Sequence, residues 1–90
     1  VRLRLDRLTA DRGTLFRALR AEGIGVNVHY FPVHLQPLYR ERCGTAPGDC
    51  PQAEAAYERL LTLPLFSSMT AADAADTIAA LRKTLRWWRR

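Results

Sequence analysis

The sequence predicts a small α/β domain, in which a three-stranded sheet packs on helices. Residues 1–6 alternate apolar and basic side chains, and residues 24–30 carry apolar side chains at every second position, which is the period of a strand. Elsewhere apolar residues recur at three- and four-residue spacing between capping residues and glycine or proline stops, which indicates helices. We expect one domain over residues 1–90, because 90 residues supply a single modest core.

The first strand, residues 1–6, leads into a helix that ends near Arg20. Thr9 or Asp11 begins this helix, because a side-chain oxygen there accepts a hydrogen bond from a free backbone amide. Gly23 ends it, since glycine adopts the left-handed conformation without strain. The side chains predicted to be buried are Leu15, Phe16 and Leu19.

The second strand, residues 24–30, ends before Pro32, which has no amide hydrogen to give to a sheet. Pro37 then begins a short helix that runs through Arg42, because proline fits the first turn of a helix. Residues 43–49 contain turn-forming residues throughout and are expected to be an exposed, mobile loop.

Pro51 begins the next helix, whose Glu54 and Glu58 lie one turn apart and are predicted to face outward. Residues 61–65 form a brief third strand, which Pro64 interrupts.

Thr70 begins the last helix, with Asp73 three positions later as in a capping box. Trp87 and Trp88 cannot both face the core, because neighbouring helical positions diverge by about 100°. The stripe predicted to be buried consists of Ala74, Ile78, Leu81 and Leu85.

The composition is that of a folded protein, with 48% hydrophobic and 26% charged residues. No apolar run is long enough for a membrane span, and the first residues are not a signal peptide, so we expect a cytoplasmic protein. The chain starts without methionine inside a predicted strand, which suggests a piece of a longer protein.

The net charge of +5 raises the alternative of a small nucleic-acid-binding module, although the basic residues are scattered and nearly all arginine. A solvated charged surface explains this charge more simply. A further alternative is a partner-binding module anchored by Trp87 or Trp88.

Residues 23–39 concentrate two imidazoles, two phenols and two prolines in one run, which indicates a surface that meets a ligand. Asn27 and His29 share a strand face, Tyr30 lies at the strand end, and His34 lies in the loop after it. Imidazole, phenol and amide groups can hydrogen-bond sugar hydroxyls or phosphate oxygens. In the structural alternative, His29 bonds a backbone carbonyl and Tyr30 packs.

Cys43 and Cys50 bracket a turn-rich segment at a spacing that suits neither a redox pair nor a zinc knuckle. A zinc site that combines them with His29 and His34 is chemically conceivable, but the spacings match no known module. A loop disulfide is also sterically possible. We expect incidental thiols and no metal.

The chain resembles the C-terminal small domain of the DegT/DnrJ/EryC1/StrS sugar aminotransferases. The similarity covers nearly the whole chain and is carried by residues 19–34 (LRAEGIGVNVHYFPVH), 36–39 (QPLY), 50–54 (CPQAE), 61–65 (LTLPL) and 70–85. Within the family, residues 28–37 are most similar to the branch that aminates a UDP-linked 4-keto-6-deoxy-hexosamine in pseudaminic acid biosynthesis.

The resemblance implies the C-terminal domain of a fold type I enzyme, homodimeric in the parent, with pyridoxal phosphate held by a large N-terminal domain. It implies amino transfer from glutamate to a nucleotide sugar, with His29, Tyr30, Asn27 and His34 on the substrate side. Lys83 is the only lysine and is predicted to lie on the outer face of the last helix. We therefore expect no catalytic and no cofactor-binding residue in this chain, and no transamination by it alone.

Overall fold

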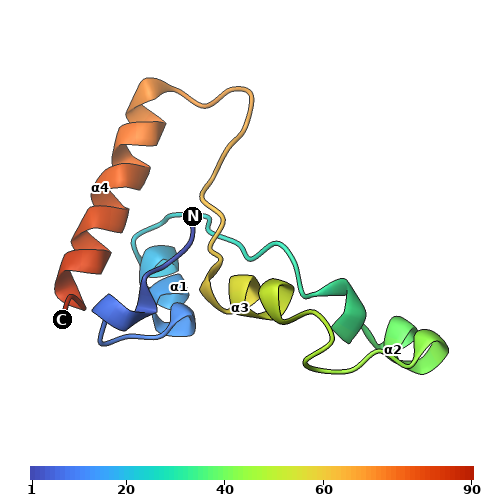
Figure 1. The fold of residues 1–90 in the computed structure, drawn as a ribbon. Helices are drawn as coiled ribbons and strands as arrows, with labels where there is room; N and C mark the ends of the chain where they lie inside the picture. The colour runs from blue at the N-terminus through green and yellow to red at the C-terminus, as the bar shows by residue number, and fades with distance from the viewer.

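The protein is helical, and the predicted three-stranded sheet is wrong. The computed structural model describes all of residues 1–90 and contains α-helices and 3-10 helices but no strand (Figure 1). The α-helices are α1 (Arg12–Ala21), α2 (Pro37–Cys43), α3 (Pro51–Arg59) and α4 (Ala71–Trp87), and the 3-10 helices are η1 (Leu5–Arg7) and η2 (Val33–Leu35).

The segments predicted as strands nevertheless meet, each at an isolated antiparallel bridge. Arg2 pairs with Leu60, and Asn27 pairs with Thr62. The second bridge has both of its backbone hydrogen bonds, of 3.0 and 2.8 Å. Residues 60–62 therefore lie between the other two segments, without a continuous ladder.

The ladders stop because the neighbouring amides bond elsewhere or are missing. The chain turns into η1 shortly after Leu3. The Val26 amide bonds to the Ile24 carbonyl at 2.8 Å, and the Val28 amide bonds to Oδ1 of Asn27 at 2.8 Å. Pro64 has no amide to donate.

Local capping residues define α1 as predicted. Of the two candidate caps, Asp11 is the one used, and its Oδ1 accepts from the Thr14 amide at 2.7 Å. Gly23 has φ 81°, and its amide bonds to the Arg20 carbonyl at 3.0 Å. The Ile24 amide bonds to the carbonyl of Leu19, which completes a Schellman stop.

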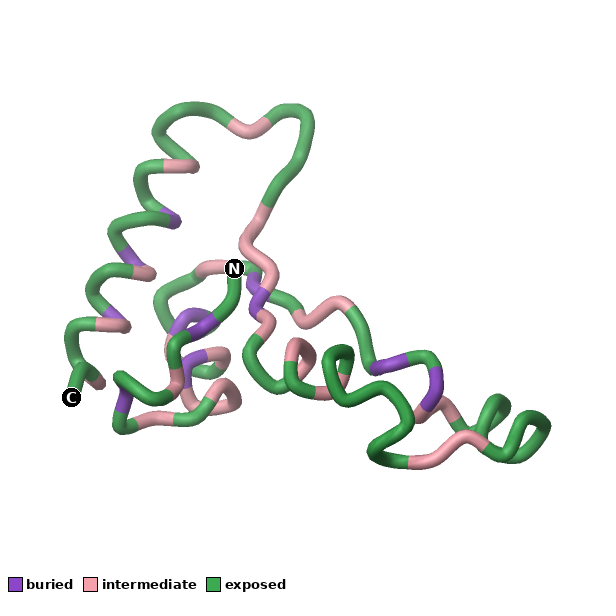
Figure 2. The backbone as a smooth tube through the Cα atoms, in the orientation of Figure 1, coloured by how far each residue is buried: buried purple, intermediate pink, exposed green.

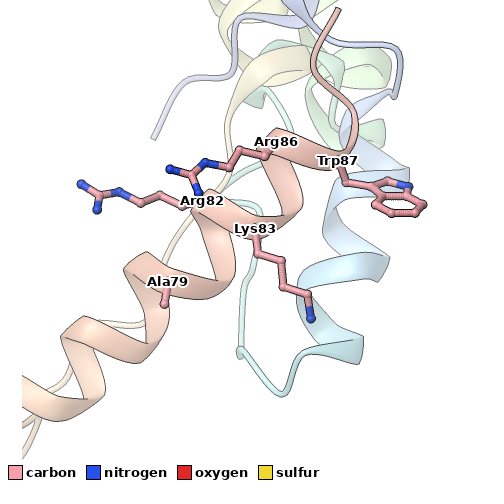
Figure 3. A pocket seen from close by; sticks show the side chains of 5 residues that line it. All are labelled: Ala79, Arg82, Lys83, Arg86 and Trp87. Atoms are coloured by element: carbon pink, nitrogen blue, oxygen red, sulfur yellow. The ribbon is translucent and has the colours of Figure 1, made fainter.

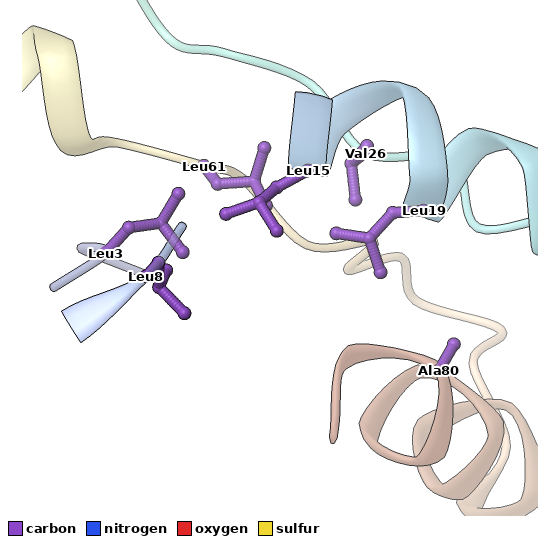
Figure 4. Close-up of a cluster of buried hydrophobic side chains, with 7 residues drawn as sticks. All are labelled: Leu3, Leu8, Leu15, Leu19, Val26, Leu61 and Ala80. Carbon is purple, nitrogen blue, oxygen red and sulfur yellow. The ribbon is translucent and has the colours of Figure 1, made fainter. Parts of the chain in front are cut away.

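The core lies where the N-terminal segment, α1, α4 and the bridged segments meet (Figure 4). It consists of Leu3, Leu8, Leu15, Leu19, Val26, Leu61 and Ala80. Figure 2 shows that most of α2 and α3 is exposed, apart from a separate buried stretch before α2. The radius of gyration is 15.6 Å and the shortest extent is 19 Å. A compact domain of this length has a radius of gyration of about 12 Å, so the molecule is flat and extended.

The face that α4 buries differs from the predicted stripe. Thr77, Ala80 and Thr84 are its buried residues, whereas Ile78 is 49% exposed. Small side chains allow α4 to approach α1 closely, and Oγ1 of Thr77 bonds to the Asp73 carbonyl at 2.9 Å. Short polar side chains can therefore occupy the helix contact, while the larger apolar residues lie beside it.

The ends of α4 agree with the sequence prediction. Thr70 and Asp73 form a reciprocal capping box, which also lowers the pKa of Asp73 through its bonds with Thr70. Trp87 is 81% exposed, while Trp88 packs against the core. None of the helices has the length and apolarity that a membrane span requires.

Candidate functional site

His29 and Tyr30 present polar rings on the extended segment between α1 and η2. Nδ1 of His29 lies 2.9 Å from Oγ1 of Thr62, whose backbone is itself paired with Asn27. This contact fixes the imidazole and leaves its Nε2 without a protein partner. Tyr30 is 76% exposed, and its ring meets His29 edge to face with centroids 4.5 Å apart.

Asn27 adds an amide to the same stretch. Its side chain is exposed, and its Oδ1 accepts from the Val28 amide at 2.8 Å, while its NH₂ group donates to no other residue of the chain. The segment therefore offers an amide donor, an imidazole nitrogen and a phenol to an external ligand. This combination suits hydroxyl groups and phosphate oxygens.

His34 is placed differently from the other three predicted site residues. It is only 9% exposed, and its Nε2 lies 2.7 Å from Oε1 of Glu54. The same carboxylate oxygen accepts from the Gly48 amide at 2.7 Å. These contacts with His34 and then Gly48 lower the pKa of Glu54. The prediction that Glu54 faces outward is therefore wrong, since it fastens the loop before α3 to η2.

The loop of residues 43–49 is exposed in most of its length but is held at several points. Oγ1 of Thr45 donates to the His34 carbonyl at 2.6 Å, and the Ala46 amide donates to Asp49 at 2.8 Å. Cys43 and Cys50 are exposed free thiols. No three histidine, cysteine or acidic side chains come together, so the conceivable zinc site is not formed.

An aromatic cluster that the sequence pattern does not reveal begins at Phe31, directly after Tyr30. Phe31 meets Tyr57 edge to face, with centroids 5.6 Å apart. The Arg12 guanidinium lies 4.4 Å from the centre of the Tyr57 ring and also donates to the Tyr57 carbonyl. The cluster joins α1, α3 and the segment after Tyr30, so it fixes where that segment leaves the core.

Thr62 belongs to the site as well, and the strand pattern of residues 61–65 does not reveal it. The one signal was a lone hydroxyl in an otherwise apolar run. Its contact with His29 joins residues 33 positions apart. Sequence spacing alone does not reveal such a pair.

Lys83 lies on the surface of α4, far from these rings in the chain. Its Nζ donates to both carboxylate oxygens of Glu22, at 2.8 and 3.0 Å, and its side chain is 70% exposed. Lys83 lines a shallow depression of about 550 Å³, and Figure 3 shows the side chains around it. The lining consists of Ala79, Arg82, Lys83, Arg86 and Trp87.

Comparison with known proteins identifies the family of the chain. It belongs to the DegT/DnrJ/EryC1/StrS aminotransferase family, which it matches over residues 1–82. Enzymes of this family generally depend on pyridoxal phosphate. The family expected from the sequence is thus confirmed, whereas the narrower likeness to the pseudaminic acid branch is not.

Two relatives show the extent of the match. The chain is 40% identical over 81 residues to the uncharacterized protein MJ1066 of Methanocaldococcus jannaschii. The aligned region covers 90% of this chain and 21% of MJ1066. It is 40% identical over 76 residues to the spore coat polysaccharide biosynthesis protein SpsC of Bacillus subtilis, which covers 83% of this chain and 20% of SpsC. The chain thus spans about a fifth of the length of these relatives.

Proposed function

We propose that the chain is the C-terminal, substrate-facing part of a sugar-nucleotide aminotransferase of polysaccharide biosynthesis, located in the cytoplasm. The family match over residues 1–82 carries this proposal, and the name of SpsC supports its polysaccharide context. In the full-length homodimer, glutamate donates the amino group to a 4-keto-6-deoxy UDP-sugar.

In this proposal His29, Tyr30 and Asn27 contact the sugar nucleotide. Thr62 orients the imidazole so that Nε2 is directed to the ligand, and the phenol and amide bond neighbouring oxygens. His34 supports this surface indirectly, because its contact with Glu54 holds the loop that borders α3. Fixed donors lose little entropy on binding, which is the advantage of such support.

The residues of this chain do not fit pyridoxal phosphate. Covalent pyridoxal chemistry needs a lysine amine that is free to react with the cofactor aldehyde. The amine of Lys83, the only lysine, is exposed and bonded to both oxygens of Glu22. We therefore assign cofactor binding and the chemical step to parts of the full-length enzyme outside residues 1–90.

An NMR titration of the 90-residue chain with UDP-N-acetylglucosamine tests the substrate surface. We expect amide shift changes at residues 27–30 and at Thr62, with a dissociation constant in roughly the millimolar range, because only part of the site is present. The double variant His29→Ala with Tyr30→Ala should lose these changes. Tyr39→Ala, which removes a partly exposed ring on α2, is the matched control and should keep them.

Two results would contradict the proposal. Shift changes confined to the arginines of α4 would mean that the phosphates bind a general cationic surface. A borohydride-trapped pyridoxal adduct at Lys83, together with measurable amino transfer, would show that the chain carries the chemistry itself.

A further inference from the structure

A groove of about 500 Å³ lies between the N-terminal segment and α4, and none of its lining residues belongs to the candidate site at Asn27, His29 and Tyr30. Every residue that lines it is either an arginine or an aliphatic residue, and none is acidic. We call it the arginine groove. Its lining consists of Val1, Arg2, Leu3, Arg4, Arg7, Leu8, Leu81, Arg82, Leu85, Arg86 and Arg89.

The arginines come from both walls of the arginine groove, three from the N-terminal segment, two from α4 and one, Arg89, from just beyond the end of α4. Only Arg4 has a carboxylate partner, with its Nη2 3.1 Å from Oδ2 of Asp6. On α4, Figure 3 shows Arg82 and Arg86 directed to one side of the helix and Trp87 to the other. The other arginines of the groove therefore carry positive charge without a carboxylate partner in this chain.

All lining residues of the groove other than the arginines are aliphatic. Leu3 and Leu8 belong to the core, Leu81 and Leu85 are half-buried, and Val1 is 53% exposed. Apolar surface that remains in contact with water favours a partner with an apolar face of its own. A phosphate backbone has no such face, so the lining does not favour a nucleic acid.

A second copy of the chain is a poor occupant of this groove. A two-fold symmetric contact places the same surface of both copies together, which would set arginine against arginine. Like charges in close contact oppose association. The charge pattern instead calls for carboxylates on the partner.

We propose that the arginine groove binds an acidic amphipathic helix of a partner polypeptide. The apolar stripe of that helix packs on the aliphatic lining, and its glutamate or aspartate side chains pair with the arginines on both walls. Arginine suits this role because its planar guanidinium bonds carboxylates through two parallel hydrogen bonds. From Leu81 to its end at Trp87, α4 rises by about 9 Å, which matches between one and two turns of a partner helix.

A designed peptide of about 18 residues, long enough to form a helix, provides the probe. It carries a leucine stripe flanked by glutamates, and a second peptide has lysines in place of the glutamates. Isothermal titration against the 90-residue chain should give a dissociation constant in roughly the micromolar range for the glutamate peptide and no binding for the lysine peptide. Affinity should fall as salt rises, because exposed ion pairs are screened.

Charge reversal locates the binding surface. The double variant Arg82→Glu with Arg86→Glu should weaken the glutamate peptide about tenfold or more, as expected from the loss of two pairs and the added repulsion. The matched control reverses Arg40 and Arg42, two exposed arginines of α2, and should leave the affinity unchanged. Circular dichroism of both variants establishes that their helices remain formed.

Several outcomes would overturn the proposal. Failure of the glutamate peptide to bind at about 1 mM would contradict it. Equal binding of the lysine peptide would indicate unspecific apolar adhesion. If a single-stranded oligonucleotide binds more tightly than the peptide, and charge reversal of Arg82 and Arg86 abolishes this binding, the groove is a nucleic-acid surface. Self-association of the chain that this same reversal abolishes would identify a second copy.

Discussion

Replacement of Leu19 by alanine tests the packing of the core most directly. Leu19 is fully buried on α1 within the cluster that includes Leu15, Val26 and Leu61 (Figure 4). The substitution removes three carbon atoms, worth about 2.5 kcal/mol of transfer free energy at about 0.8 kcal/mol each. The cavity left behind adds to this, so we expect the free energy of unfolding to fall by about 3 kcal/mol. Alanine favours helix, so the propensity of α1 is not reduced.

Urea denaturation followed by circular dichroism measures this loss. With a slope of roughly 1 kcal/mol per molar urea, the midpoint should fall by about 3 M. If the total stability is roughly 5 kcal/mol, the variant should remain folded without urea and have its midpoint near about 2 M. Leu65→Ala is the matched control, because Leu65 is 90% exposed and its truncation should change stability by less than about 0.5 kcal/mol. Equal effects of the two substitutions would refute the described core.

Three further outcomes are expected. Thr70→Ala should lower the free energy of unfolding by about 1 kcal/mol, measured by urea denaturation, because it breaks the capping box of α4. The native pKa of Glu54 is lowered, so its ionised form stabilises the fold fully above the unfolded pKa of about 4.3. This contribution should be lost as the pH falls through the lower native pKa. The chemical shift of the Gly48 amide, which donates to Glu54, measures that titration. Thr62→Val should release the His29 ring and weaken the shift changes caused by UDP-N-acetylglucosamine.

Each of these outcomes has a control or a contradicting result. Ser67→Ala is an exposed hydroxyl deletion outside the cap and should leave stability unchanged. Glu54→Gln should remove the pH dependence of the Gly48 shift, and a dependence that persists would assign it to another group. Binding by Thr62→Val with unaltered affinity would show that the imidazole needs no such support.

The helices were predictable because short-range chemistry determines where they begin and end. Asp11, Gly23 and the Thr70 box act within four residues of the backbone groups that they satisfy. The sheet was not predictable, because the alternation of residues 1–6 describes which side chains are apolar but not whether a ladder can continue. That depends on competing amide bonds, such as the bond from Val28 to the Asn27 side chain.

The candidate site shows the same division between local and distant determinants. The chemistry of His29, Tyr30 and Asn27 could be inferred from one continuous run, and all three lie at or near the surface. The environment of His34 could not, since Glu54 lies 20 positions away and closes on it only in the folded chain. Similarly, the packing of Thr77 and Thr84 on α4 contradicts their polarity and follows from how closely α1 approaches.

The 19 Å thickness of the molecule has a thermodynamic consequence. Since one helix with its side chains is about 10 Å across, only about two helices fit in this dimension, and a single layer of side chains can be removed from water. A molecule this thin buries little apolar surface by itself, so a partner that covers one of its faces should add substantially to its stability. A partner that binds only the folded chain stabilises it by an amount that grows with the logarithm of the partner concentration, once this exceeds the dissociation constant. The melting temperature should rise accordingly, so thermal shift measurements can rank partners without an activity assay.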